Sequence, residues 1–149
     1  MDKKQIVITT PLGPIIAVAD DRALYALEFT DHGKYPMGRT KAIDLLEKEL
    51  DRYFAGNLKA FETKVHLEGT PFQMAVWEEL KNIPFGQTKS YAELAKAIHK
   101  PTAFRAVANA LGANKLPIIL PCHRVINANG ELGGYNGGTL RKKWLLNHE

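Results

Sequence analysis

The spacing of hydrophobic residues changes part-way along the chain, from short β-prone runs to helical periodicity. Residues 6–10 and 15–19 are rich in isoleucine and valine and flank a proline- and glycine-containing turn at residues 11–14, which predicts a β-hairpin. A second turn leads into a third run that continues through Phe29. The first part of the chain is therefore predicted to form a small antiparallel sheet.

Beyond a loop at residues 31–38, the pattern predicts one helix that ends at Gly56. Five apolar residues share one face of that helix: Ile43, Leu46, Leu50, Tyr53 and Phe54. This N-terminal α+β unit carries no obvious chemistry. No cysteine accompanies His32 or His66 to hold a zinc ion, so both are expected to be solvated or structural.

From residue 69 onward the pattern is helical. Thr70 can cap a helix, Pro71 suits its first turn, and three apolar residues follow at a spacing of four. The Pro-Phe-Gly sequence at residues 84–86 breaks this helix. The boundary between the two regimes predicts two domains, residues 1–68 and 69–149.

Two further helices are predicted around a tight turn. The first starts with a capping box at residues 90–93 and is expected to bury Leu94 and Ile98. The second covers residues 103–111 and stops at Gly112. Two short helices around a turn are typical of a helix-turn-helix. Apart from arginine and asparagine, the outward residues expected on the second helix are alanines, which cannot read base edges by hydrogen bonding.

Charge is distributed unevenly between the two parts. The chain of 149 residues has a net charge of +4. Residues 1–68 hold 10 Lys/Arg against 11 Asp/Glu, whereas residues 69–149 hold 10 against 5. A basic half supplies the sequence-independent attraction to phosphates that DNA binding needs, although many other domains carry a similar surplus.

Composition excludes several classes of protein. The 45% hydrophobic and 24% charged residues are typical of a globular protein. The sequence contains no apolar run that predicts a membrane span, no signal-peptide pattern, no phosphate-binding glycine loop and no metal-ligand motif. With one unpaired cysteine, the expected location is a reducing, cytoplasmic compartment, or the nucleus in a eukaryote.

Cys122 is the only cysteine and lies in the run Pro-Cys-His-Arg-Val at residues 121–125. A lone cysteine is most often a small buried hydrophobe. A histidine and an arginine beside it, however, predict surroundings that favour the nucleophilic thiolate.

This run closely resembles the active-site region of the O6-alkylguanine-DNA alkyltransferases, also called methylated-DNA–protein-cysteine methyltransferases. Residues 133–138 (Gly-Gly-Tyr-Asn-Gly-Gly) and 144–149 (Trp-Leu-Leu-Asn-His-Glu) carry the same resemblance. It implies an α+β fold, with a ribonuclease-H-like N-terminal domain followed by a winged helix-turn-helix-like domain that holds the cysteine. It also implies irreversible, single-turnover transfer of an alkyl group from O6 of a flipped-out guanine to Cys122, with O4 of thymine left open as a second substrate atom.

The resemblance assigns catalytic roles to five residues. Cys122 would accept the alkyl group, His123 would act through a water molecule, Glu149 would hold the imidazole, Tyr91 would donate a proton to the departing guanine and Asn114 would brace the turn before the cysteine segment. The expected DNA-contacting residues are Tyr91, Thr102, Ala103, Arg105, Ala106 and Asn109, with Arg105 filling the gap left by the flipped base.

The same resemblance places the base in a pocket lined by Leu111, Val125, Gly134, Tyr135 and Asn136. Backbone carbonyls of Cys122 and Val125 would accept from the exocyclic amine, and the Asn136 amide would donate to O6. Relatives often carry serine in place of Asn136. No cofactor or metal is implied, because the damaged base is itself the alkyl donor. The expected partner is double-stranded DNA containing O6-alkylguanine, bound by a monomer with no membrane association.

Two alternatives remain open. The chain could bind alkylated bases without reacting and mark them for other repair factors, although the alkyltransferase-like proteins that do so carry tryptophan in place of the cysteine. It could also be a hydrolase that uses Cys122 and His123 for acyl transfer. Adjacent side chains diverge by about 100° on a helix, so direct contact between these two is not expected, and turnover would separate the two chemistries.

Overall fold

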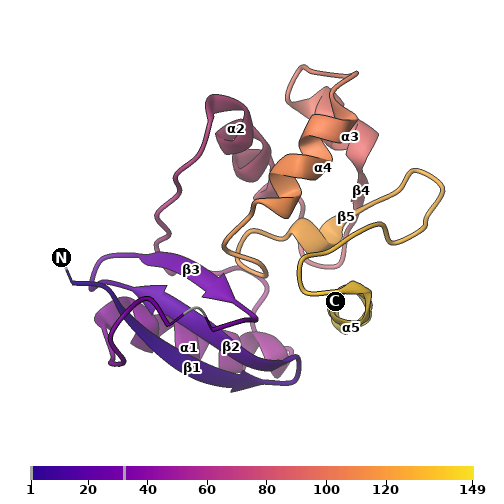
Figure 1. Ribbon diagram of the computed structural model, residues 1–149. Coiled ribbons are helices and arrows are strands. Elements are labelled where there is room, and N and C mark those ends of the chain that lie inside the picture. The colour runs from indigo at the N-terminus through magenta and orange to yellow at the C-terminus, as the bar shows by residue number, and fades with distance from the viewer. Residues whose placement is uncertain (1, 32) are drawn as a thin grey trace. The chain divides into compact units, whose positions relative to one another are not determined.

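The computed structural model describes residues 2–31 and 33–149, and its internal contacts divide the chain into two compact units, Met1–Leu67 and Glu68–Glu149 (Figure 1). The first unit contains a three-stranded sheet and one long helix, and the second is mostly helical. No helix within the described ranges is long and apolar enough to cross a membrane.

The sheet of the first unit is antiparallel with strand order β1-β2-β3. Its strands are β1 (Lys4–Thr10), β2 (Gly13–Ala19) and β3 (Leu24–Glu28). The β1–β2 turn is tighter than predicted, because Gly13 adopts a φ of 98° and already pairs with Thr10. The third strand ends one residue before Phe29.

The helix α1 (Lys41–Phe54) packs against β1 and β2. Its N-terminus is capped by Thr40, whose hydroxyl accepts from the Ile43 N–H at 3.2 Å. Four of the five residues expected on its apolar face are buried, whereas Phe54 is partly exposed. Gly56 follows the helix with φ 82°, as its predicted role requires.

Of the two histidines of the first unit, His66 lies with its ring 4.6 Å from the ring of Tyr25. His32 lies outside the described residues. Among the residues that the structure describes, no group of three His, Cys, Asp or Glu side chains could hold a metal ion.

The second unit contains α2 (Pro71–Leu80), α3 (Tyr91–Ala97), α4 (Phe104–Gly112) and α5 (Thr139–His148). Both predicted helix starts are confirmed as capping boxes, Thr70 with Gln73 on α2 and Ser90 with Glu93 on α3. Two details differ from prediction. Ile98 is the partly exposed C-cap of α3 rather than a core residue, and α4 includes Gly112 and ends at the cap Ala113.

A short parallel sheet, which the sequence pattern did not predict, connects the start of α3 to the cysteine segment. Its strands are β4 (Lys89–Ser90) and β5 (Val125–Ile126), with Lys89 opposite Val125. Because α3 begins directly after β4, this pairing places Tyr91 beside the segment that carries Cys122. The Trp77 indole N–H donates to the Ala110 carbonyl at 2.8 Å and so joins α2 to α4 in the core of the unit.

Candidate active site around Cys122

Cys122 begins the 3-10 helix η1 (Cys122–Arg124), just before β5. The segment that leads to it contains Ile118 at φ 74°, a conformation that branched residues rarely adopt. The Asn114 side chain forms hydrogen bonds with the start and the end of this segment. Its oxygen accepts from the Leu116 N–H at 2.8 Å, and its nitrogen donates to the Leu120 carbonyl at 3.0 Å. Asn114 therefore fixes the backbone on which the cysteine is carried.

A pocket of about 240 Å³ opens onto the cysteine. This volume is below the roughly 300–1,000 Å³ of sites for drug-sized ligands, which suits a ligand the size of one base. The pocket is lined by Tyr91, Ala108, Leu111, Gly112, Cys122, Gly134, Tyr135 and Asn136. The α4 residues Ala108 and Gly112 were not expected there.

Four of the five residues expected in the base pocket line it, and Val125 does not. The Val125 side chain is fully buried, and its carbonyl accepts a hydrogen bond from the Lys142 ammonium at 2.6 Å. Its side chain is therefore not part of the pocket wall, and the acceptor role expected of its carbonyl stays a prediction. The Asn136 amide nitrogen donates to the Gly112 carbonyl, which links the glycine-rich loop to the end of α4.

Tyr91 occupies the first position of α3 and lines the pocket next to the glycine-rich loop at residues 133–138. A Cβ atom on Gly133 would lie 2.7 Å from the Tyr91 hydroxyl, and Gly133 has φ 73°. Glycine is needed there for both reasons. Burial, with a smaller effect of Cys122, raises the pKa of Tyr91, and a hydrogen bond with the Gly134 backbone partly opposes this. The phenol therefore keeps its proton at neutral pH.

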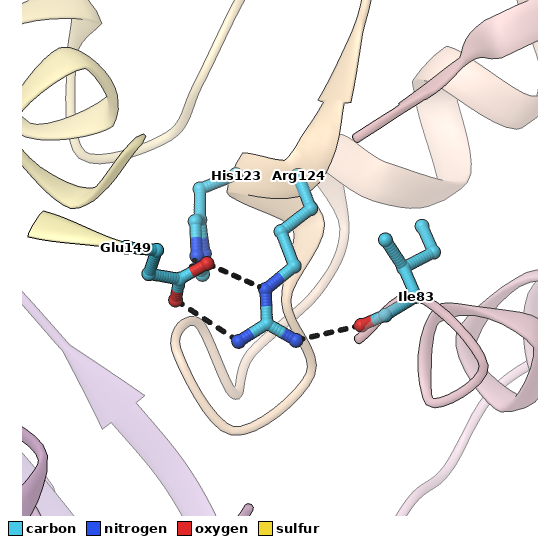
Figure 2. Close-up of polar contacts among 4 residues, drawn as sticks. All are labelled: Ile83, His123, Arg124 and Glu149. Atoms are coloured by element: carbon cyan, nitrogen blue, oxygen red, sulfur yellow. Dashed lines mark hydrogen bonds and ion pairs between the residues drawn. The ribbon is translucent and has the colours of Figure 1, made fainter. Parts of the chain in front are cut away.

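Glu149 forms a buried ionic cluster with His123 and Arg124 (Figure 2). Its carboxylate lies 2.8 Å from His123 Nε2 and accepts from Arg124 Nε and Nη2 at 2.7 and 2.9 Å. The remaining arginine nitrogen, Nη1, donates to the Ile83 carbonyl at 2.7 Å. Only 2% of the Glu149 side chain is exposed. All three guanidinium nitrogens of Arg124 therefore donate to Glu149 or to Ile83.

His123 is fully buried, and burial lowers its pKa despite the opposing effect of Glu149. The ring is therefore neutral at pH 7. Its Nε2 faces the carboxylate and so carries the ring proton, which leaves Nδ1 with a free lone pair. Nδ1 is buried and has no hydrogen-bond partner within the described part of the chain.

The thiol of Cys122 does not have the ionisation expected from its sequence neighbours. Burial raises its pKa to about 11, and the Asn114 hydrogen bond and the Lys142 charge only partly oppose this. The prediction that His123 and Arg124 favour the thiolate is wrong for the protein alone. The cause is burial of the thiol, which the two neighbours do not offset because the histidine is neutral and the arginine charge is balanced by Glu149.

Lys142 is a buried charged residue near the cysteine that the sequence pattern did not single out. It is fully buried in α5, and its ammonium donates to the Val125 and Gly134 carbonyls at 2.6 and 3.1 Å. Burial lowers its pKa to about 8, and the Cys122 charge opposes this. Lys142 lies three residues before the buried Leu145 and seven before Glu149, so the helical period places all three on one face. That periodicity was the available signal.

Four of the six expected DNA-contacting residues are exposed, three on α4 and one just before it. Thr102, Arg105, Ala106 and Asn109 are exposed, whereas Ala103 is the half-buried N-cap. The expectation that alanines account for the rest of the outward face is wrong, because Phe104 is 52% exposed.

The two units match two models of one protein family. Residues 71–149 match the DNA binding domain of 6-O-methylguanine DNA methyltransferase, and residues 4–67 match its ribonuclease-like domain. The chain belongs to the 6-O-methylguanine DNA methyltransferase family. This confirms the resemblance seen in the sequence and the α+β fold that it implied.

Relatives in this family are similar to the chain over nearly its whole length. A methylated-DNA–protein-cysteine methyltransferase of Methanosarcina acetivorans is 42% identical, with 96% of each chain covered. The protein of the same name from Salmonella typhimurium is 43% identical, with 95% of this chain and 92% of the relative covered. A crystal structure of Mycobacterium tuberculosis OGT in complex with DNA has a TM-score of 0.90 at 39% identity, covering 99% of this chain and 91% of that one.

The raised pKa of Cys122 predicts how the thiol reacts with a small reagent. The rate of alkylation by iodoacetamide should rise about tenfold per pH unit from pH 7 to 10, because only the thiolate reacts and its fraction grows at that rate below its pKa. Mass spectrometry of the peptide that contains Cys122 measures the rate. A plateau reached below pH 9 would show that the folded protein already holds the thiolate.

Replacing the buried ammonium should make the thiolate still harder to form. We expect Lys142→Met to slow iodoacetamide alkylation of Cys122 several-fold at pH 8, because the variant lacks the cation that opposes the burial effect. The matched control is Lys143→Met, which removes an exposed lysine from the same helix. Equal rates in the two variants, with both folded by circular dichroism, would contradict a role of Lys142 in the charge balance.

Proposed function

We propose that this chain repairs DNA by moving an alkyl group from O6 of a guanine in duplex DNA onto the sulfur of Cys122, once per molecule. The observation that carries the proposal is the placement of the only cysteine in the wall of a base-sized pocket. Its family membership and the DNA complex of a relative support the same activity. A guanine in a duplex has its O6 atom within the stack, so the nucleotide must rotate out to reach this pocket.

The first step is removal of the thiol proton. Because burial keeps Cys122 protonated, the reaction needs a base near the sulfur. His123 is that base in the proposal: its ring is neutral, and Nδ1 has a lone pair without a hydrogen-bond partner. A water between Sγ and Nδ1 would carry the proton. Glu149 then stabilises the imidazolium through Nε2–H, as a carboxylate does in a Ser-His-Asp triad.

The second step is displacement at the alkyl carbon. The thiolate forms the C–S bond while the C–O6 bond breaks, and the departing guanine takes up one proton. Tyr91, which lines the pocket with its phenol protonated, passes a proton to the guanine. The proton that His123 took from the thiol returns through water to the phenolate, so that the net transfer is from the thiol to the guanine. The Lys142 ammonium offsets the charge on the sulfur before transfer. The product is a thioether, which is stable to hydrolysis, so each molecule reacts once.

Binding to duplex DNA is assigned to α4 and the basic second unit. Arg105 is exposed near the start of α4 and would fill the space that the flipped guanine leaves in the stack. Without such a group the base would return, since unstacking costs a few kcal/mol. Exposed alanines beside it allow the helix backbone to approach the groove closely. We expect one monomer to act on each lesion.

A lesion-binding protein that does not react is the second candidate. It would need the same pocket and the same helix, but it would have no use for a cysteine in the pocket wall with a neutral, buried histidine beside it in the chain. A cysteine hydrolase is disfavoured because the sulfur and imidazole come from adjacent residues and the pocket belongs to a DNA-binding domain.

Mass spectrometry separates these candidates. Incubation with duplex DNA containing O6-methylguanine should add one methyl group to the peptide that contains Cys122, with no more than one product per protein molecule. Cys122→Ser should show no transfer but should still bind the duplex. An unmodified peptide alongside intact lesion would refute alkyl transfer, and several products per molecule would identify a catalytic hydrolase.

The gap-filling role of Arg105 is tested by comparing two substrates. Arg105→Ala should slow transfer from duplex DNA at least about tenfold, as expected when a few kcal/mol of unstacking lose their compensation, while transfer from the free base O6-methylguanine changes much less. Arg105→Lys keeps the positive charge but not the planar guanidinium, so it separates the contribution of the charge from that of the side-chain shape. Equal slowing on both substrates would instead place Arg105 in the support of the pocket.

A further inference from the structure

Phe104 lies on the same face of α4 as the residues that wall the base pocket. Ala108, Leu111 and Gly112 line that pocket, and Phe104 precedes them by four, seven and eight residues. Residues at these spacings fall in one stripe along a helix. The stripe that forms the pocket wall therefore continues toward the N-terminus of α4 and ends at an aromatic side chain.

The length of this stripe sets the reach of Phe104. With a rise of 1.5 Å per residue, the Phe104 backbone lies about 6 Å along the axis from Ala108 and about 10 Å from Leu111. A base held against Leu111 and Gly112 has left the stack of the duplex. Phe104, about 10 Å from Leu111 along the helix axis, therefore lies outside the pocket, within reach of the strand that carries the extruded base.

The aromatic ring of Phe104 is exposed and takes no part in a ring contact among the described residues. It is 52% exposed, and no described residue forms a ring contact with it. The other exposed residues of α4 are small or polar: Arg105, Ala106, Ala108, Asn109 and Gly112. A large apolar side chain in this position contributes a favourable hydrophobic free energy only when a binding partner buries it.

Duplex DNA is the partner that the surroundings favour. Phe104 is next to Arg105, lies in the part of the chain that matches the family's DNA binding domain, and belongs to the half with ten basic and five acidic residues. Aromatic side chains stack on bases and sugars with little dependence on sequence, and apolar side chains can wedge into a base step and favour its unstacked form.

We propose that Phe104 packs against the nucleotide next to the extruded guanine and so stabilises the complex in which the damaged base occupies the Cys122 pocket. The inference rests on the proposed function, since it assumes a base in that pocket. It adds a contact at the pocket mouth that is separate from gap filling by Arg105. The face of α4 then has two sections, an inner one that receives the base and an outer one that holds its neighbour.

The binding test uses Phe104→Ala in the Cys122→Ser background, where no transfer occurs. The probe is a duplex with O6-methylguanine and a fluorescent 2-aminopurine at the adjacent position. Loss of the ring should weaken binding at least about fivefold, in line with the effect of removing one aromatic stack, and should change the 2-aminopurine emission in the complex. Phe104→Trp should restore both. The control is Leu140→Ala, which removes a side chain that is 85% exposed on α5.

A transfer assay with the native cysteine gives an independent measurement. In Phe104→Ala the ratio of the rate on duplex to the rate on free O6-methylguanine should fall at least about fivefold. An unchanged ratio would overturn the proposal, and so would an equal loss on both substrates, which would make Phe104 a support of the pocket. Equal losses in Leu140→Ala would show a general surface effect and also overturn it.

The two proposals fail in distinguishable ways. If the protein with native Cys122 and Phe104 gains no methyl group from the duplex, the proposed function itself fails. If it is methylated and Phe104→Ala behaves identically in binding and in transfer, only the contact assigned to Phe104 is refuted. A protein partner at this surface in place of DNA would show the same pattern as the second result.

Discussion

The carboxylate of Glu149, buried between His123 and Arg124, is the interaction on which the site depends. It joins the end of α5 to η1 and determines which imidazole nitrogen carries the proton. A buried ion pair contributes little net stability, but removing one partner typically costs about 3–5 kcal/mol. Because Arg124 balances the carboxylate charge, the histidine can stay neutral beside it and keep Nδ1 available as a base. The same anchoring fixes α5, and therefore the ammonium of Lys142, against the pocket.

Burial of the cysteine has two opposite effects on reactivity. It raises the pKa of the thiol to about 11, which makes the free protein a poor nucleophile at neutral pH. It also keeps the sulfur in the protonated form, which reacts slowly with small electrophiles and oxidants at neutral pH. For a protein that is consumed by one reaction, this selectivity matters more than resting reactivity. In the proposed mechanism the thiolate is needed only when a base fills the pocket, and the neutral histidine and the buried ammonium would help to form it then.

Local signals in the sequence predicted the elements that local chemistry determines. The Thr70 cap of α2, the capping box of α3, the hairpin of β1 and β2, and the turn residue Gly56 depend on side chains within a few residues of each other. The β4–β5 pairing could not be predicted, because two residues in each strand give no periodicity. The ionisation of Cys122 was predicted wrongly for a related reason. It depends on burial and on where the charges of His123 and Arg124 are directed, and neither is visible in the adjacency of three residues.

The site also shows why a helix that is poor in polar side chains suits this domain. An α4 built to read base edges would need long polar residues on its outer face, and these would hold its backbone away from the duplex. Here the exposed alanines have short side chains, so the helix backbone can approach the duplex closely. The two large exposed side chains, Phe104 and Arg105, are adjacent near the N-terminus of α4. Consecutive residues diverge by about 100° on a helix. Arg105 is therefore turned by about 100° from Phe104 and, three residues before Ala108, borders the pocket-lining stripe that Phe104 continues. One short helix can in this way address both the space that a flipped base leaves and the path that it takes to the sulfur.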